Sequence, residues 1–148
     1  MKPNEGRLQT SEHILAKILE GKLEGITVGI SKFKEDSGLL EITSAADPRG
    51  LDMGGLESEV NSVIKRGLPV HKPTMERAEA EKVADLRKVP SSVTKVTIID
   101  IAGFDTRPCR DPHVSNTGEI GHFKILGLEK VGNGRYRFVF TVEDKPNQ

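Results

Sequence analysis

The sequence has little cysteine: Cys109 is the only one among its 148 residues. An intramolecular disulfide is therefore excluded, and a lone thiol is typical of proteins from reducing compartments. The chain also lacks an apolar run near the ~20 residues that are needed to cross a bilayer. Residues 1–7, MKPNEGR, lack the apolar core of a secretory signal. We therefore expect a cytoplasmic protein with no membrane partner.

The chain has no net charge, because 22 Lys and Arg residues balance 22 Asp and Glu residues. Proteins that grip long nucleic acids through many phosphates are usually basic. The balance argues against DNA as a partner, and it predicts that any RNA is held through a local patch. A length of 148 residues suits one compact core, so we expect residues 1–148 to form a single domain.

The spacing of apolar residues predicts both helices and strands. Recurrence at three and four residues predicts helices at 8–23, around 56–64 and at 75–86. Alternation predicts strands at 26–33, 39–43, 93–101, 120–131 and 135–142. Residues 102–116 are predicted to be a loop after a strand in the middle of a sheet. This order indicates an α+β fold, with a mainly antiparallel sheet packed with helices.

The start of the first predicted helix decides where two polar side chains point. Thr10 or Ser11 could cap the helix, which would place Glu12 near the positive end of the helix dipole. Gln9 and His13 share a side of the helix only if its first turn already includes Gln9. With Thr10 as the cap, Gln9 would lie outside the helix. The pattern leaves both possibilities open.

Residues 109–121, CRDPHVSNTGEIG, carry the strongest chemical pattern in the chain. The thiolate of Cys109 and the imidazole of His113 can turn toward one metal ion, and Pro108 and Pro112 stiffen the loop between them. Zinc requires three or four nitrogen and sulfur donors, so the others must come from elsewhere. Residues 9–15, QTSEHIL, are the best source. The other two histidines, at 71 and 122, fit a surface linker and a strand.

The segment QTSEHIL and the later segment CRDPHVSNTGEIGHFKI together resemble the AlaX family and the related editing domains of alanyl- and threonyl-tRNA synthetases. In that family an early helix carries HxxxH, and a late loop carries CxxxH followed by a turn close to SNTGEIG. His13 matches the second early histidine, and Cys109 and His113 match the late pair. Gln9 stands where the first histidine is expected, and there the chain departs from the family pattern.

The resemblance implies a Zn²⁺ ion that is held by His13, Cys109 and His113. A neutral amide is a poor zinc donor, so we expect Gln9 to hold a water in the fourth position by hydrogen bonding. Thr27 is the nearest match to a threonine that lines the pocket of related enzymes and helps to recognise a hydroxyl-bearing amino acid. Residues 116–119 either form only a turn or, by resemblance, shape one wall of the editing pocket.

The function that the resemblance implies is zinc-dependent deacylation of mischarged aminoacyl-tRNA in trans, with seryl-tRNA specific for alanine as the expected substrate. Such editing exists because a synthetase pocket for a small amino acid cannot strongly exclude a near isostere. The partner would be the acceptor end of the mischarged tRNA. Two alternatives stay open. One is a catalytically degenerate editing-like domain that binds tRNA or a protein, which Gln9 favours. The other is a small structural zinc protein, which would unfold on chelation.

Overall fold

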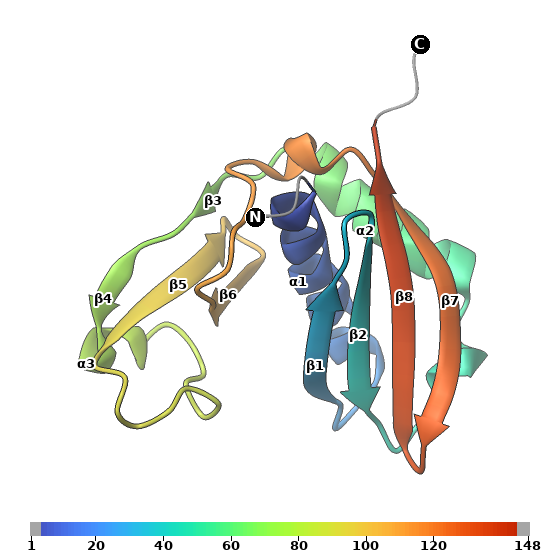
Figure 1. Cartoon of the computed structure of the whole chain (residues 1–148), viewed down its shortest axis with the longest axis horizontal. Coiled ribbons are helices and arrows are strands. Elements are labelled where there is room, and N and C mark those ends of the chain that lie inside the picture. Colours follow the sequence, from blue (N-terminus) through green and yellow to red (C-terminus); the bar gives the residue numbers. More distant parts are fainter. Residues whose placement is uncertain (1–3, 145–148) are drawn as a thin grey trace.

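Two antiparallel sheets lie on either side of a central helix in the computed structural model, which describes residues 4–144 (Figure 1). The larger sheet has the order β1-β2-β8-β7, with β1 at Thr27–Phe33, β2 at Ser37–Thr43, β8 at Arg135–Glu143 and β7 at His122–Gly132. The smaller sheet contains β3 at Val70–His71, β4 at Thr74–Glu76, β5 at Lys95–Ile101 and β6 at Asp105–Pro108. The helices are α1 at Glu5–Lys22, α2 at Met53–Lys65 and α3 at Arg77–Ala80, with 3-10 turns η1 at Pro48–Gly50 and η2 at Thr117–Ile120.

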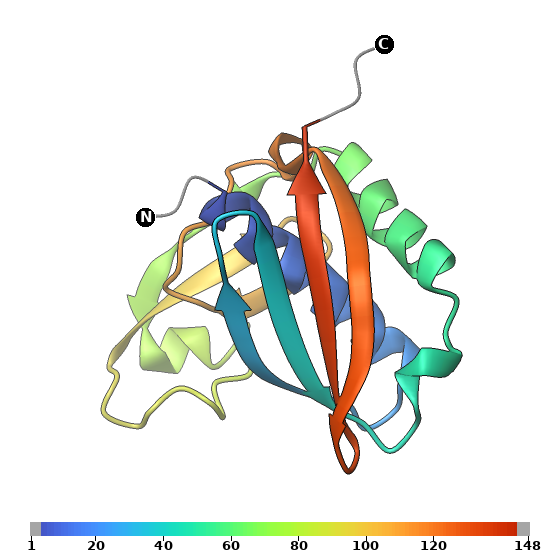
Figure 2. The ribbon, with the colours of Figure 1, turned by 45° about the vertical axis from the view of Figure 1, so that its right-hand side comes forward.

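The predicted fold class is confirmed. All strand pairs in the described part of the chain are antiparallel, and the helices α1 and α2 lie against one face of the larger sheet (Figure 2). On β8, the side chains of Tyr136, Phe138 and Phe140 are buried in alternation, because successive residues of a strand point to opposite faces. The larger sheet therefore presents one apolar face to the two helices.

The first helix begins at Glu5, so of the two open possibilities the structure excludes a cap at Thr10 or Ser11. The polar run of residues 9–13 lies inside α1 and is almost fully buried. A polar run usually marks a helix end because solvent meets it there. Here α1 lies between the two sheets, and tertiary contacts cover a turn that would otherwise be solvated. Gln9 is thus within the helix and four residues before His13.

The predicted helix at 75–86 is largely wrong. Residues 74–76 form β4, which pairs with β5, and only Arg77–Ala80 is helical. The Arg77 guanidinium donates to the carbonyl oxygens of Pro90 (2.8 Å) and Val93 (2.9 Å), which fixes the irregular segment that follows. A weakly apolar segment gains more from the free edge of β5 than from a helix of its own. The predicted loop at 102–116 likewise contains a strand, β6, on the opposite edge of β5.

The strand β5 joins two hydrophobic clusters. Ile99 and Ile101 belong to the larger cluster, which fills the space between the larger sheet, α1 and α2. Val96 and Ile98 belong to a smaller cluster that includes Ala80 and Leu86. Burial on both faces agrees with the prediction that this strand lies in the middle of a sheet. Among the residues described, no helix is both long and apolar enough to cross a membrane.

Candidate metal centre

Three metal-ligating side chains converge at the seam between the two sheets. His13 comes from α1, whereas Cys109 and His113 come from the segment after β6, and their donor atoms all lie within 4.8 Å of one another. His113 Nε2 is 3.4 Å from Cys109 Sγ, and the two imidazole rings meet edge to face with centroids 4.6 Å apart. Donors around a tetrahedral zinc ion are separated by roughly 3.3–3.8 Å, given Zn–N and Zn–S bonds of about 2.0 and 2.3 Å. The set therefore has the chemistry and nearly the spacing that zinc requires.

The hydroxyl of Thr10 orients the imidazole of His113. Thr10 Oγ1 donates to the carbonyl oxygen of Gly6 (3.0 Å) and accepts from the backbone N–H of Val114 (3.2 Å). Its third contact is His113 Nδ1 at 2.9 Å. Because the hydroxyl has one proton, this network is satisfied when His113 Nδ1 carries the other proton and donates it. His113 Nε2, which faces Cys109, is then the free metal-binding nitrogen.

A glycine lets the loop come close to the helix. A Cβ atom at Gly6 would lie 3.3 Å from the carbonyl carbon of His113, which is tighter than ordinary packing allows. From the other side, Lys72 Nζ donates to the carbonyl oxygen of His113 over 2.9 Å. The backbone of His113 is thus held from α1 and from the segment after β3.

Arg107 ties the strand that precedes the loop to α1. Its Nε atom lies 2.6 Å from Asp105 Oδ2, and its Nη2 atom forms an ion pair with Glu20 on the helix. Arg107 and Asp105 are partly buried in this arrangement. Cys109 follows two residues after Arg107, so these ion pairs hold the chain against α1 close to the thiol.

Burial sets the protonation of the three donors. It lowers the pKa of His13 well below its usual value, and it lowers the pKa of His113 to about 4, with a further contribution from the Lys72 ammonium. It raises the pKa of the Cys109 thiol to about 11, which the nearby carboxylates of Asp111 and Glu12 also favour. Both imidazoles are therefore neutral near pH 7, as metal ligands must be. Among the described residues, the buried His13 Nδ1 finds no hydrogen-bond partner, and a metal ion in this site would satisfy the imidazole of His13.

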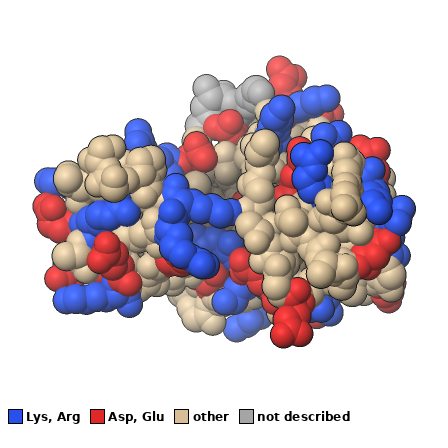
Figure 3. All heavy atoms as spheres, turned by 90° about the horizontal axis from the view of Figure 1, so that it is seen from below, with Lys and Arg blue, Asp and Glu red and all other residues tan. Residues whose placement is uncertain are grey.

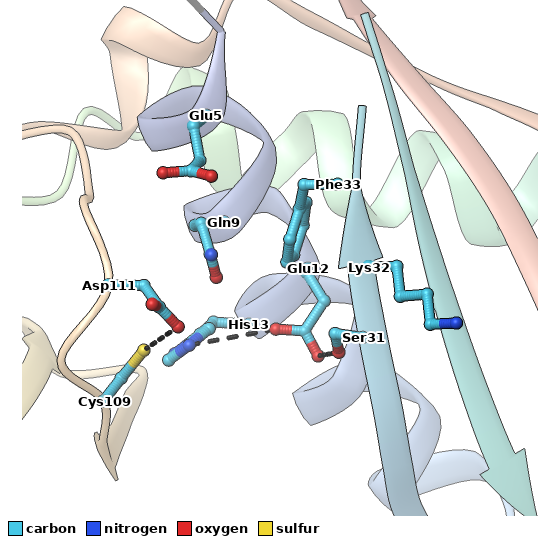
Figure 4. A pocket seen from close by; sticks show the side chains of 9 residues that line it. All are labelled: Glu5, Gln9, Glu12, His13, Ser31, Lys32, Phe33, Cys109 and Asp111. Carbon is cyan, nitrogen blue, oxygen red and sulfur yellow. Dashed lines mark hydrogen bonds and ion pairs between the residues drawn. The ribbon is translucent and has the colours of Figure 1, made fainter. Parts of the chain in front are cut away.

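A pocket of about 380 Å³ opens beside these donors, between α1, β1 and the loop (Figure 4). It is lined by Glu5, Gln9, Glu12, His13, Ser31, Lys32, Phe33, Cys109 and Asp111. Gln9 and His13 share one side of α1 here, so the question about the helix start is settled. The side chains of Gln9 and Asp111 both point toward His13 (Figure 4).

Glu12 is a pocket residue whose placement the sequence pattern did not reveal. It accepts a hydrogen bond from Ser31 Oγ (3.2 Å), and its Oε2 atom is 3.8 Å from His13 Nε2. Burial raises the pKa of Glu12 to about 7, although the Ser31 hydroxyl opposes that rise. The contact with His13 is not a full ion pair near neutral pH, because the pKa of His13 is lowered. The available signal was a charged residue four positions after Leu8 and three before Leu15, on the helical spacing of buried apolar residues.

Other predicted site residues do not meet in this pocket. Thr27 is exposed at the start of β1, where it pairs with Thr43, and Ser31 is the hydroxyl of β1 that lines the pocket. Residues 116–119 form a capped turn that is anchored on α2: Thr117 Oγ1 contacts the carbonyl oxygen of Ile64 at 3.2 Å. None of residues 116–119 lines the pocket. The histidines at 71 and 122 are absent from the three-donor cluster.

The fold and the donor cluster are consistent with a synthetase editing domain, and the sequence is similar to such domains. Residues 96–139 match the "Threonyl and Alanyl tRNA synthetase second additional domain", a segment that runs from β5 through the loop with Cys109 and His113 into β8. The alanine–tRNA ligase of Thermofilum pendens is 36% identical over 88 residues, which are 57% of this chain and 10% of that protein.

Two relatives that are named as alanyl-tRNA editing proteins are similar along nearly the whole chain. The alanyl-tRNA editing protein AlaX-L of Pyrococcus horikoshii is 29% identical over 136 residues, or 91% of this chain. AlaX-M of Saccharolobus solfataricus is 28% identical over 145 residues, or 93% of this chain. The chain spans 33% and 58% of these two relatives. The resemblance that the two motifs predicted is confirmed: the chain is a relative of the alanyl-tRNA editing proteins.

Proposed function

We propose that this chain is a hydrolase that deacylates mischarged aminoacyl-tRNA in trans, with Zn²⁺ held by His13, Cys109 and His113. The observation that supports this most strongly is the convergence of these three donors beside a pocket, from two motifs about a hundred residues apart. The similarity to alanyl-tRNA editing proteins supports seryl-tRNA specific for alanine as the substrate. Residues 1–148 would act as one editing-like domain in the cytoplasm.

The reaction is hydrolysis of the ester at the 3′ end of the tRNA. Water adds to the carbonyl carbon, the ribose oxygen leaves with a proton, and free tRNA and serine result. A bound Zn²⁺ would supply Lewis acidity toward the carbonyl or the attacking water. Two neutral imidazoles and one thiolate would hold the ion as three protein ligands, the number found in catalytic zinc sites. The side-chain amide of Gln9 points into the pocket and can hydrogen-bond a water there.

The pocket carries negative groups that suit an aminoacyl ester. Glu5, Glu12 and Asp111 line it, while Lys32 directs its ammonium group away from them (Figure 4). The free α-ammonium group of an aminoacyl-tRNA would be attracted to such carboxylates. Ser31 and Glu12 form a hydroxyl–carboxyl pair that can exchange hydrogen bonds with the serine hydroxyl. The volume of about 380 Å³ suits a small ligand.

The acceptor end of the tRNA requires basic groups near the pocket, although the chain as a whole is neutral. Lys and Arg side chains gather near the middle of the lower face, where the two sheets meet (Figure 3). Lys88 contributes to the bridge between the sheets, because its Nζ atom donates to the carbonyl oxygen of Val28 on β1. A local basic surface supports brief contact with RNA phosphates.

A second candidate function is a domain that binds tRNA or a protein without catalysis. The observation in its favour is Gln9, an amide at the one pocket position where the family pattern has a histidine. This reading predicts binding of tRNA with no turnover.

The deciding experiment incubates the purified chain, with and without added zinc, with Ser-tRNA and Ala-tRNA that both carry the alanine-specific tRNA. We expect zinc-dependent loss of Ser-tRNA, with Ala-tRNA spared and the Cys109→Ala protein inactive. Asp36→Asn, which changes an exposed turn carboxylate, serves as the matched control and should keep full activity. Absence of hydrolysis by zinc-loaded protein that still binds tRNA would favour the second candidate.

A further inference from the structure

The candidate metal centre has three donors, His13, Cys109 and His113, and a tetrahedral ion has a fourth position to fill. Two pocket residues are candidates for that position, Gln9 and Asp111, and both point toward His13 (Figure 4). A neutral amide oxygen is a weak donor for zinc, whereas carboxylate oxygens are regular zinc ligands. Chemistry therefore favours Asp111.

The loop places three donors at alternate residues: Cys109, Asp111 and His113. The segment that carries them is irregular, with a bend at Asp111. Two distances connect the three side chains. Asp111 Oδ2 is 3.7 Å from Cys109 Sγ, and Cys109 Sγ is 3.4 Å from His113 Nε2. Both separations fall within the roughly 3.3–3.8 Å expected between neighbouring ligands of a tetrahedral zinc ion.

The charge of the site also favours a carboxylate. Among the described residues, Asp111 forms no ion pair with a Lys or Arg, and its nearest side-chain partner is the thiol of Cys109. As a thiol, Cys109 donates a hydrogen bond to this carboxylate. Metal binding requires the thiolate, and a thiolate and a carboxylate this close would repel each other unless a cation lay between them. Two such anions and two neutral imidazoles would neutralise the two positive charges of a zinc ion. With Gln9 in place of the carboxylate, a net positive charge would remain in a half-buried site.

We propose that Asp111 supplies the fourth ligand of this metal centre, in place of the histidine that the chain lacks at position 9. The inference rests on the proposed function only in that it places the metal in the same site. Asp111 is exposed, whereas His13 and His113 are buried. The carboxylate would therefore be the most accessible of the four ligands to water and substrate.

The test uses Co²⁺ as a spectroscopic substitute for zinc in the full chain. Affinity is measured by competition with a chelator, and the visible absorption reports the coordination of the ion. We expect intense bands of a four-coordinate site in the wild type, with a thiolate charge-transfer band from Cys109. Asp111→Asn should lower the affinity by roughly 10–100-fold, in the range seen when a supporting group of a metal site is lost, and should weaken the four-coordinate bands while keeping the thiolate band.

Restoring the missing imidazole provides the sharpest control. Gln9→His in the Asp111→Asn background should recover the affinity and the four-coordinate spectrum, because the new imidazole lies one helical turn before His13. Asp36→Asn should behave as the wild type. Circular dichroism checks that each variant is folded.

Three outcomes overturn the inference: an affinity of Asp111→Asn within about twofold of the wild type, which is below the roughly tenfold effect expected; a lower affinity with unchanged four-coordinate bands; or no Co²⁺ binding by the folded wild type. Failure of the proposed function is seen separately, in the deacylation assay. If Asp111→Asn loses metal as expected but the loaded wild type does not hydrolyse Ser-tRNA, Asp111 is a ligand and the hydrolase proposal fails.

Discussion

The two sheets differ in what holds them together. The larger sheet covers α1 and α2 and buries the phenylalanines Phe123, Phe138 and Phe140 completely. The smaller sheet has a cluster of four buried residues, and one face of β5 packs into the larger cluster instead. Most of the apolar surface that leaves water on folding therefore belongs to the larger sheet. The smaller sheet depends on its neighbour.

This difference explains where the candidate metal centre lies. His13 sits on a helix that the larger cluster fixes, and Cys109 and His113 lie on the exit from the smaller sheet. Polar contacts from Thr10 and Arg107 bring the two parts together. A metal ion shared between them would join a well-packed half to a weakly packed one, so binding should stabilise the smaller sheet most.

The largest expected effect comes from the core of the larger sheet. Phe138→Ala should lower the free energy of unfolding by about 3–5 kcal/mol, because it removes a fully buried ring and leaves a cavity. Urea unfolding followed by circular dichroism measures this. A loss below about 1 kcal/mol, far under the usual cost of such a truncation, would contradict the view that this sheet carries most of the stability.

Metal should have the next largest effect. Free zinc at about 100 times its dissociation constant should raise the free energy of unfolding by about 3 kcal/mol, if only the folded chain binds it. Hydrogen exchange should slow most at residues 105–116, which lie on the less stable side of the seam. Cys109→Ala is the control, and it should show neither change. Equal slowing of hydrogen exchange in both sheets would contradict the view that the smaller sheet is the less stable one.

A cavity in the smaller cluster should cost less than one in the larger sheet. Ile98→Ala should lower the free energy of unfolding by about 2 kcal/mol, the low end for such a change, since the small cluster near solvent can partly collapse. In this variant, the rate of hydrogen exchange should increase more in β4 and β5 than in β8. If β8 opens together with β5, the two sheets form one cooperative unit.

Variants of two hydroxyl groups on β1 test which one recognises the substrate. Ser31→Ala removes the partner of Glu12 and should reduce kcat/KM for Ser-tRNA about fivefold, equivalent to about 1 kcal/mol for one hydrogen bond. Thr27→Val is the matched variant outside the pocket. If the role predicted for Thr27 holds instead, the loss will appear in Thr27→Val and not in Ser31→Ala.

The smallest effect concerns two exposed Asp-x-Arg turns, one beside each sheet. Hydrogen bonds from Arg49 lower the pKa of Asp47 from 3.8 to about 2. Hydrogen bonds from Arg87 also lower the pKa of Asp85. A carboxyl whose pKa is lowered in the folded state stabilises the fold above its unfolded pKa, and this contribution is lost as the pH falls from about 4 toward 2. Because both pairs are exposed, each contribution is small. Urea midpoints between pH 5 and pH 2 should therefore fall slightly less steeply for Asp47→Asn than for the wild type, and likewise for Asp85→Asn. Identical slopes would show that the turns contribute nothing.

Much of the fold follows from local patterns. Alternating apolar residues located β1, β2, β5, β7 and β8, because the period of two is a property of any half-buried strand. The recurrence at three and four residues located α1 and α2 for a similar reason. Local patterns failed at residues 75–86, where the free edge of β5 converts the first residues into a strand. They also missed β6, which has few apolar residues and exists because β5 pairs with it.

The sequence by itself determined which candidate metal donors the chain offers: a lone cysteine four residues before a histidine, and a second histidine in an early helix. Only the tertiary structure decided that these donors meet, because α1 is buried between two sheets and Gly6 lets the loop approach it. The same burial turned the polar run of residues 9–13 from an expected helix end into the wall of a pocket. It also brought Glu12 and Ser31 into that pocket and left Thr27 outside. Contacts between segments about a hundred residues apart have no local signature, so this part of the site depends on the packing of the whole chain.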